Sequence, residues 1–93
     1  MALYLGDVKS NVATSSNTVF AGPARVRGIY YNANASAGSI VVKDGGSGGS
    51  TIITIATPAS GYGNITIPGD GILCTTNVYV ALTNIASATV FYG

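Results

Sequence analysis

The chain has 93 residues, the length of one domain, and only 8% of them are charged, against about 25% in ordinary soluble domains. A net charge of +1 leaves no field that would attract nucleic acid or an anionic membrane surface. Because 47% of the residues are apolar and the chain is nearly neutral, we expect it to associate with itself or with other proteins. The alternative is a monomer whose surface is polar but uncharged.

The N-terminal stretch predicts an arm or a short edge strand over residues 2–6. Residues 1–7 have no basic region and no long apolar core, so they lack the pattern of a secretion signal. No apolar run approaches the length of about 18–20 residues that a membrane-spanning helix needs. We therefore expect the protein to be made in the cytoplasm and to leave it only inside a larger object. Residues 7–13 are weakly strand-like, and a turn cluster at 14–17 leads to a short strand at 18–20.

Residues 25–31 are predicted to form a strand that is interrupted by a glycine. Strict alternation places Arg25 and Arg27 outward and Val26 inward. Gly28 breaks this pattern, and a bulge there would restore it. Beyond the bulge, the residues predicted to face inward are Ile29 and Tyr31, and the residue predicted to face outward is Tyr30.

The middle of the chain predicts a hairpin. Two runs rich in β-branched residues, 39–44 and 51–56, flank the Gly/Ser segment 45–50. β-Branched side chains pack well on a pleated surface, and glycine reaches positive φ without steric cost, so the chain can reverse there. The side chains predicted to face one core are Ile40, Val42, Ile53 and Ile55.

Short strands and turns continue to the end of the sequence. The further strands are predicted at residues 64–68, 72–74, 78–83 and 88–93. The turns between them are predicted at residues 57–61, 69–71, 75–77 and 84–87. The inward-facing side chains of these strands are predicted to include Ile65, Ile67, Val78, Val80 and Leu82. The nearest approach to a helix, at 84–88, is one turn long.

Seven to nine short strands with regular turns and no helical period predict an all-β fold. We expect an antiparallel β-sandwich or a small jelly-roll or barrel. Within this single domain, residues 1–23 are interpreted as an N-terminal arm with the first short strands. Residues 24–93 are interpreted as the β-sandwich core.

The residue types argue against an enzyme. The absence of histidine removes the commonest general base and metal ligand. The one cysteine, Cys74, permits no internal disulfide or zinc site and is predicted to be a small buried hydrophobe. The acids Asp7, Asp44 and Asp70 lie in or beside turns, where a carboxylate usually accepts hydrogen bonds from nearby backbone amides. We therefore expect no catalytic residues, no cofactor and no metal site.

Seven residues are candidates for contacts with other proteins. Arginine and tyrosine are enriched in protein interfaces, and the outward surface is predicted to carry Arg25, Arg27 and Tyr79. The apolar arm adds Ala2, Leu3, Tyr4 and Leu5. The alternative for the two arginines is a solvated strand face that blocks unwanted pairing.

The later part of the chain resembles small proteins encoded among the structural genes of tailed bacteriophages, many of them marine or cyanobacterial. The resemblance covers about residues 24–93 and is carried by these segments in order: RVRGIYY (25–31), SIVVKDGG (39–46), TIATPA (54–59), IPGDGIL (67–73), VYVALTNI (78–85) and ATVFYG (88–93). These are strand and turn motifs, so they indicate kinship and supply no functional residues.

The resemblance implies a small β-sandwich component of the virion, made in the host cytoplasm. The leading expectation is a capsid decoration, or cement, protein on the capsid surface. Such a protein would form a homo-oligomer, with a trimer as one expected form, and would bind the major capsid protein or other virion proteins. The alternatives are a tail, neck or fibre component, or a module that binds glycans on the host surface.

Overall fold

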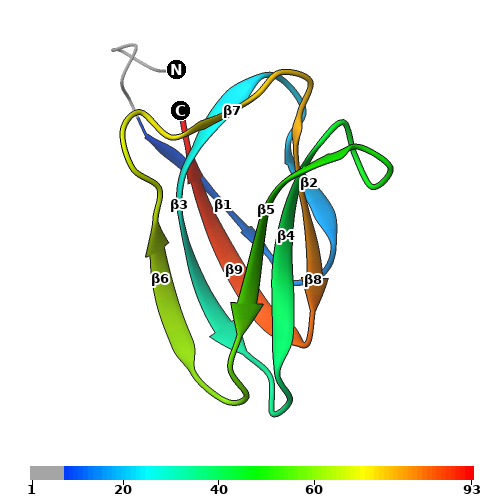
Figure 1. Cartoon of the computed structure of the whole chain (residues 1–93), viewed down its shortest axis with the longest axis vertical. Coiled ribbons are helices and arrows are strands. Elements are labelled where there is room, and N and C mark those ends of the chain that lie inside the picture. The colour runs from blue at the N-terminus through cyan, green and yellow to red at the C-terminus, as the bar shows by residue number, and fades with distance from the viewer. Residues whose placement is uncertain (1–7) are drawn as a thin grey trace.

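The computed structural model describes residues 8–93, and every regular element in this range is a β-strand (Figure 1). The strands are β1 (Lys9–Ala13), β2 (Asn17–Phe20), β3 (Ala24–Ala33), β4 (Gly38–Asp44), β5 (Ser50–Thr57), β6 (Tyr62–Thr66), β7 (Ile72–Cys74), β8 (Val78–Thr83) and β9 (Ile85–Tyr92). Within this range no helix is long and apolar enough to cross a membrane.

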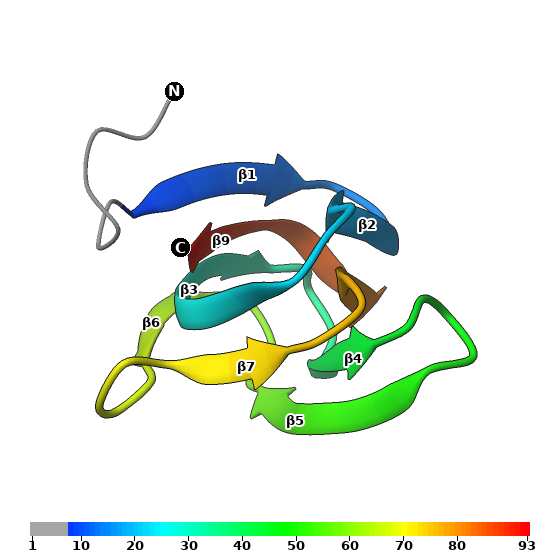
Figure 2. The same cartoon turned by 90° about the horizontal axis from the view of Figure 1, so that it is seen from above.

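The strands form two sheets in which every pairing is antiparallel (Figure 2). The first sheet has the order β1-β9-β3-β6, and β7 pairs with β3 on the same side as β6. The second sheet has the order β2-β8-β4-β5. The predicted antiparallel β-sandwich is therefore confirmed.

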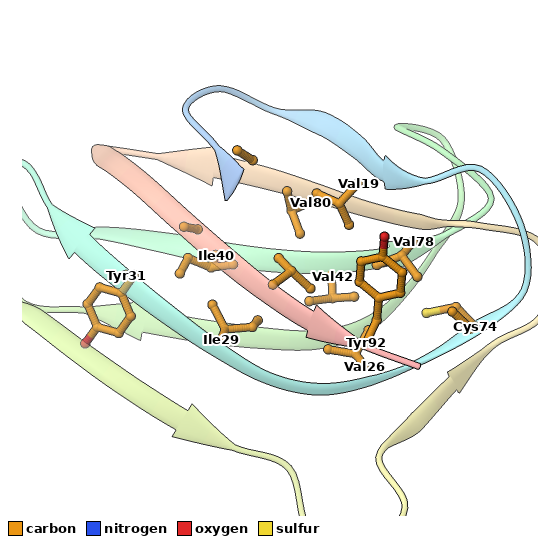
Figure 3. Close-up of a cluster of buried hydrophobic side chains, with 14 of the residues drawn as sticks. Val19, Val26, Ile29, Tyr31, Ile40, Val42, Cys74, Val78, Val80 and Tyr92 are labelled. Atoms are coloured by element: carbon orange, nitrogen blue, oxygen red, sulfur yellow. The ribbon is translucent and has the colours of Figure 1, made fainter. Parts of the chain in front are cut away.

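The core lies between the sheets because the central strands alternate between buried and exposed side chains, as period-two geometry requires. In Figure 3, Val26 and Ile29 of β3 lie opposite Ile40 and Val42 of β4. The eight largest fully buried side chains are Ile29, Ile40, Val26, Val42, Val78, Val80, Val90 and Cys74. The predicted burial of Cys74 is therefore confirmed.

The predicted irregularity in β3 is also confirmed. The register of β3 against β9 shifts between Val26 and Gly28, and Ile29 beyond the shift is fully buried. Tyr31 is buried too, whereas Tyr30 is exposed, as predicted. Without the extra residue, the second half of β3 would present the opposite set of side chains to the core.

The predicted central hairpin is formed by β4 and β5, with Ile40 opposite Ile55 and Val42 opposite Ile53. The two β4 side chains are fully buried, whereas those of β5 are half-buried. The β4 side chains are covered more fully because β4 lies between β8 and β5, whereas β5 is the edge strand of its sheet.

The turn predicted at 84–87 is wrong, and so is the one-turn helix candidate there, because β9 already begins at Ile85. Asn84 alone reverses the chain, with φ of 53°, a conformation that asparagine tolerates better than most residues. Its Nδ2 donates a hydrogen bond of 2.9 Å to the carbonyl oxygen of Ala37. The connection between β8 and β9 is therefore one residue long, and not the four residues predicted.

The first two strands of the chain lie in different layers of the sandwich. β1 pairs with β9 in the first sheet, and β2 pairs with β8 in the second. Ala13 and Val19 are both buried in the common core. At one end of the core the rings of Phe20 and Tyr92 pack at a centroid distance of 5.0 Å.

Candidate functional site

The outer face of the first sheet is the best candidate for binding. Directly paired residues of antiparallel strands point to the same side, so the registers of the strands define this face. Its side chains are Ser10, Val12, Tyr30, Asn32, Tyr62, Asn64, Thr66, Ser87, Thr89 and Phe91. None of these ten residues carries a charge. We call this set the outer face.

Apolar and aromatic side chains are exposed on the outer face. Tyr62 is 74% exposed, Val12 is 58% exposed and Tyr30 is 40% exposed. The Tyr30 and Tyr62 rings lie 6.4 Å apart and are tilted by 45°. Single exposed apolar residues are ordinary on a protein surface, but several together on a part of a sheet face that carries no charged side chain are typical of a contact surface.

Two features give the outer face a defined shape. Phe91 lies over Gly28, because a Cβ on that glycine would come 3.9 Å from Cδ2 of the phenyl ring. Asn32 donates a hydrogen bond of 3.4 Å from Nδ2 to Oγ of Ser87, which links β3 to β9. The face therefore combines rings with neutral hydrogen-bonding groups.

The two arginines lie at one end of the first sheet. Arg25 is exposed and is paired with Leu73 of β7, whose side chain is 46% exposed. Arg27 is half-buried where the register of β3 shifts, and its Nε is buried without a hydrogen bond within residues 8–93. These cations border the outer face.

Tyr79 is not near the arginines. It lies on β8 in the second sheet, paired with Thr18 and Lys43, and points away from the core. The two sheets lie on opposite sides of the core, so Arg25, Arg27 and Tyr79 do not share one surface. The arm residues Ala2, Leu3, Tyr4 and Leu5 lie outside the described residues.

Sequence reasoning missed most of the outer face. The alternation around Ile65 implied which side chains of β6 point outward, but no facing was assigned to residues 88–93, and the sequence could not show that both strands flank β3. Only the pairings of β3 with β6 and with β9 bring Tyr30, Tyr62 and Phe91 onto one surface.

A second cluster joins the glycine hairpin to the β7–β8 loop. The Asp44 carboxylate accepts hydrogen bonds from the backbone N–H groups of Thr75, Thr76 and Asn77, at 2.8, 2.8 and 3.3 Å. It also accepts one from the Thr75 hydroxyl at 2.9 Å. The Thr75 amide, followed by that of Thr76, lowers the pKa of Asp44, because these bonds favour the charged carboxylate.

The expectation that Asp44 bonds nearby amides is corrected by this geometry. The amides that it binds lie 31 to 33 positions later in the sequence. Its bonding capacity is used within the fold, so the cluster is structural.

The described residues offer little reactive chemistry. No group of three or more Cys, Asp or Glu side chains suited to a metal ion occurs within residues 8–93. Burial, and secondarily the charge of Asp44, raises the pKa of the Cys74 thiol. A buried thiol held in its protonated form is a poor nucleophile.

No protein-family model matches the chain, and comparisons with curated proteins and with solved structures give no match either.

Proposed function

We propose that the protein is a structural component of a tailed-phage virion, and specifically a decoration protein that forms a homo-oligomer and binds the major capsid protein on the capsid surface. The observation that carries this proposal is the uncharged outer face, with Val12, Tyr30 and Tyr62 exposed on it. The sequence resemblance to phage structural proteins supplies the class of partner.

A decoration protein works by binding other virion proteins, so it needs a contact surface and no reactive groups. Depletion of charge and enrichment of aromatic residues are the compositional signs of an interface core. The rings of Tyr30 and Tyr62 lose little conformational freedom on binding and bury a large area, so they are the expected energetic centre of the contact. Arg25 and Leu73 would lie at the rim.

The test is co-sedimentation of the purified protein with empty capsids of the phage that encodes it. The double variant Tyr30→Ser/Tyr62→Ser should weaken capsid binding at least about tenfold, since each truncated anchor costs about 1 kcal/mol or more. Its control is Tyr79→Ser, which alters a tyrosine on the opposite side of the sandwich.

Two results would contradict the proposal. One is a wild-type protein that does not sediment with capsids at any ratio. The other is equal binding by the double variant and by Tyr79→Ser. Both variants should first show the cooperative thermal unfolding of the wild type, because the altered side chains lie outside the core.

One observation favours a second candidate, a glycan-binding module on a tail or fibre. The tilted Tyr30–Tyr62 pair lies beside Asn32 and Asn64, and rings with neighbouring amides are groups that stack on sugars and hydrogen-bond their hydroxyls. Binding to a glycan array that is lost in Tyr30→Ser/Tyr62→Ser, without capsid binding, would favour this alternative. An array without signal at high protein concentration would exclude it.

A further inference from the structure

Strand β5 is an unprotected edge. It is the last strand of the second sheet, and its eight residues include no charge and no proline. A register shift between Val42 and Lys43 marks a bulge at Ile52, but residues 53–57 pair regularly with β4. A strand edge presents a row of backbone donors and acceptors that another strand can pair with.

The other edges of the sandwich are shorter or interrupted. β1 has five residues and begins at Lys9. β2 has four residues and an irregular register, and its Val19 carbonyl oxygen already accepts a hydrogen bond of 2.8 Å from Nδ2 of Asn11. The remaining edge is divided between β6 and β7 by residues 67–71, which include Pro68. Short strands, bulges, charge and proline are the usual protections of a sheet edge, and β5 has the fewest of them.

Half-buried isoleucines occur on or beside the end strands of both sheets. Ile52, Ile53 and Ile55 of β5 are only partly buried against the core. Ile65 and Ile67, on and just after β6, are likewise partly buried. The segment 58–61 joins β5 to β6, and so short a segment spans at most about 18 Å between them. β5 and β6 are the end strands of their two sheets, and the short connection keeps the end of β5 near the start of β6.

We propose that β5 pairs antiparallel with β5 of a second copy of this chain, about a twofold axis, to form one continuous eight-stranded sheet. This inference rests on the oligomerisation in the proposed function and names the surface that produces it. The backbone edges would supply the hydrogen bonds, and the half-buried isoleucines of the two β5 strands would be further covered at the seam.

The partner is a second β5 for two reasons. Among the edges within residues 8–93, only β5 offers eight residues to match it. Pairing with itself also closes the assembly, whereas pairing of β5 with a different edge would leave another β5 free and propagate into a fibre. Charge does not oppose the contact, because β5 is uncharged and each chain has a net charge of only +1.

The experiment compares added charge on two sheet edges. Thr51→Lys/Thr54→Lys adds two cations to β5 at exposed positions that point away from the core. Asn64→Lys/Thr66→Lys adds the same charge to exposed positions of β6, the edge of the other sheet. In a twofold dimer the first variant would bring four lysines together at the seam, and the second would not.

The readout is molar mass by light scattering between about 1 and 100 µM, the range in which contacts of modest area dissociate. The wild type and the β6 variant should reach the mass of a dimer, and the β5 variant should remain a monomer. A monomeric wild type, a trimer, an open polymer or a dimeric β5 variant would each overturn the proposal.

Hydrogen exchange identifies the edge directly. In the dimer, alternate backbone amides of β5 gain a partner strand, so they should exchange at least about tenfold more slowly than in the Thr51→Lys/Thr54→Lys monomer. Equal exchange in the two proteins would overturn the proposal.

Capsid sedimentation is measured separately on the wild type and on Thr51→Lys/Thr54→Lys, because Asn64 and Thr66 belong to the outer face. A dimer that ignores capsids would defeat the proposed function and leave the β5 pairing intact. A wild type that binds capsids as a monomer would overturn the β5 pairing and the oligomerisation, and would leave only the capsid-binding part of the proposed function.

Discussion

Asp44 and Asn77 hold each other's loops in a reciprocal arrangement. The carboxylate of Asp44 accepts from the backbone of residues 75–77, while Oδ1 of Asn77 accepts from the N–H groups of Gly45 and Gly46 at 3.1 and 3.0 Å. Both glycines have positive φ, so the hairpin turn adopts a conformation that few other residues could hold. This arrangement fastens the glycine-rich tip of the β4–β5 hairpin to the loop before β8.

The stability of the protein should fall in acid through Asp44. Its folded pKa is lowered, so its stabilisation is complete above the ordinary aspartate pKa of about 3.9 and is lost as the pH falls through the folded pKa. Asp44→Asn should therefore lower Tm at pH 7, and the Tm difference between variant and wild type should shrink as the pH falls below the ordinary aspartate range. Thermal unfolding from pH 7 to pH 2 measures this.

The control for that series is Asp70→Asn, which neutralises an exposed carboxylate in a different turn. Its unfolding curves should stay close to those of the wild type at pH 7. If Asp44→Asn follows the wild type in parallel at every pH, the carboxylate does not hold the two loops together.

Gly38 should not tolerate alanine. A Cβ at Gly38 would collide with the backbone carbonyl oxygen of Thr83, and a backbone atom cannot move away as a flexible side chain can. We expect Gly38→Ala to cost about 2 kcal/mol or more, a fall in Tm of about 10 °C or more. Thermal unfolding tests it against Gly48→Ala, because a Cβ at Gly48 meets nothing within 4 Å. Equal Tm values for the two variants would show that the close approach is relieved at no cost.

The substitution Thr57→Val should stabilise the folded protein. Its side chain is 4% exposed, and Oγ1 makes no hydrogen bond within residues 8–93. Replacing an unpaired buried hydroxyl by a methyl group of similar shape should raise the free energy of unfolding by about 1 kcal/mol. Chemical denaturation measures the change, with Thr57→Ser as the control that keeps the hydroxyl. A Thr57→Val protein that is less stable than Thr57→Ser would mean that the hydroxyl has a partner in solution.

Deletion of residues 2–6 tests the arm inferred from the sequence. We expect the deletion to abolish capsid binding and to leave Tm within a few degrees of the wild type, because the buried cluster described within residues 8–93, from Ala13 to Tyr92, would remain intact. Capsid co-sedimentation and thermal unfolding provide the two measurements. Normal decoration of capsids by the shortened protein would remove the arm from the proposed interface.

The sequence by itself determined the strands and most of their inward faces. The alternation in β3, including the break near Gly28, placed Val26 and Ile29 in the core, and the alternation in β4 placed Ile40 and Val42 there. These assignments succeed because the period of two is a property of each strand alone.

The tertiary structure decided which strands lie side by side. Strand pairing places Tyr30 beside Tyr62 and puts Arg25 and Tyr79 in different sheets. It also places β5 at the edge of its sheet. The amides that bind Asp44 lie 31 to 33 positions later in the sequence. Local patterns do not encode these relationships, since strand order follows from long-range pairing and from how the two layers bury a common core. The turn at Asn84 belongs to the same class, because only the burial of Ile85 in the core shows how soon β9 begins.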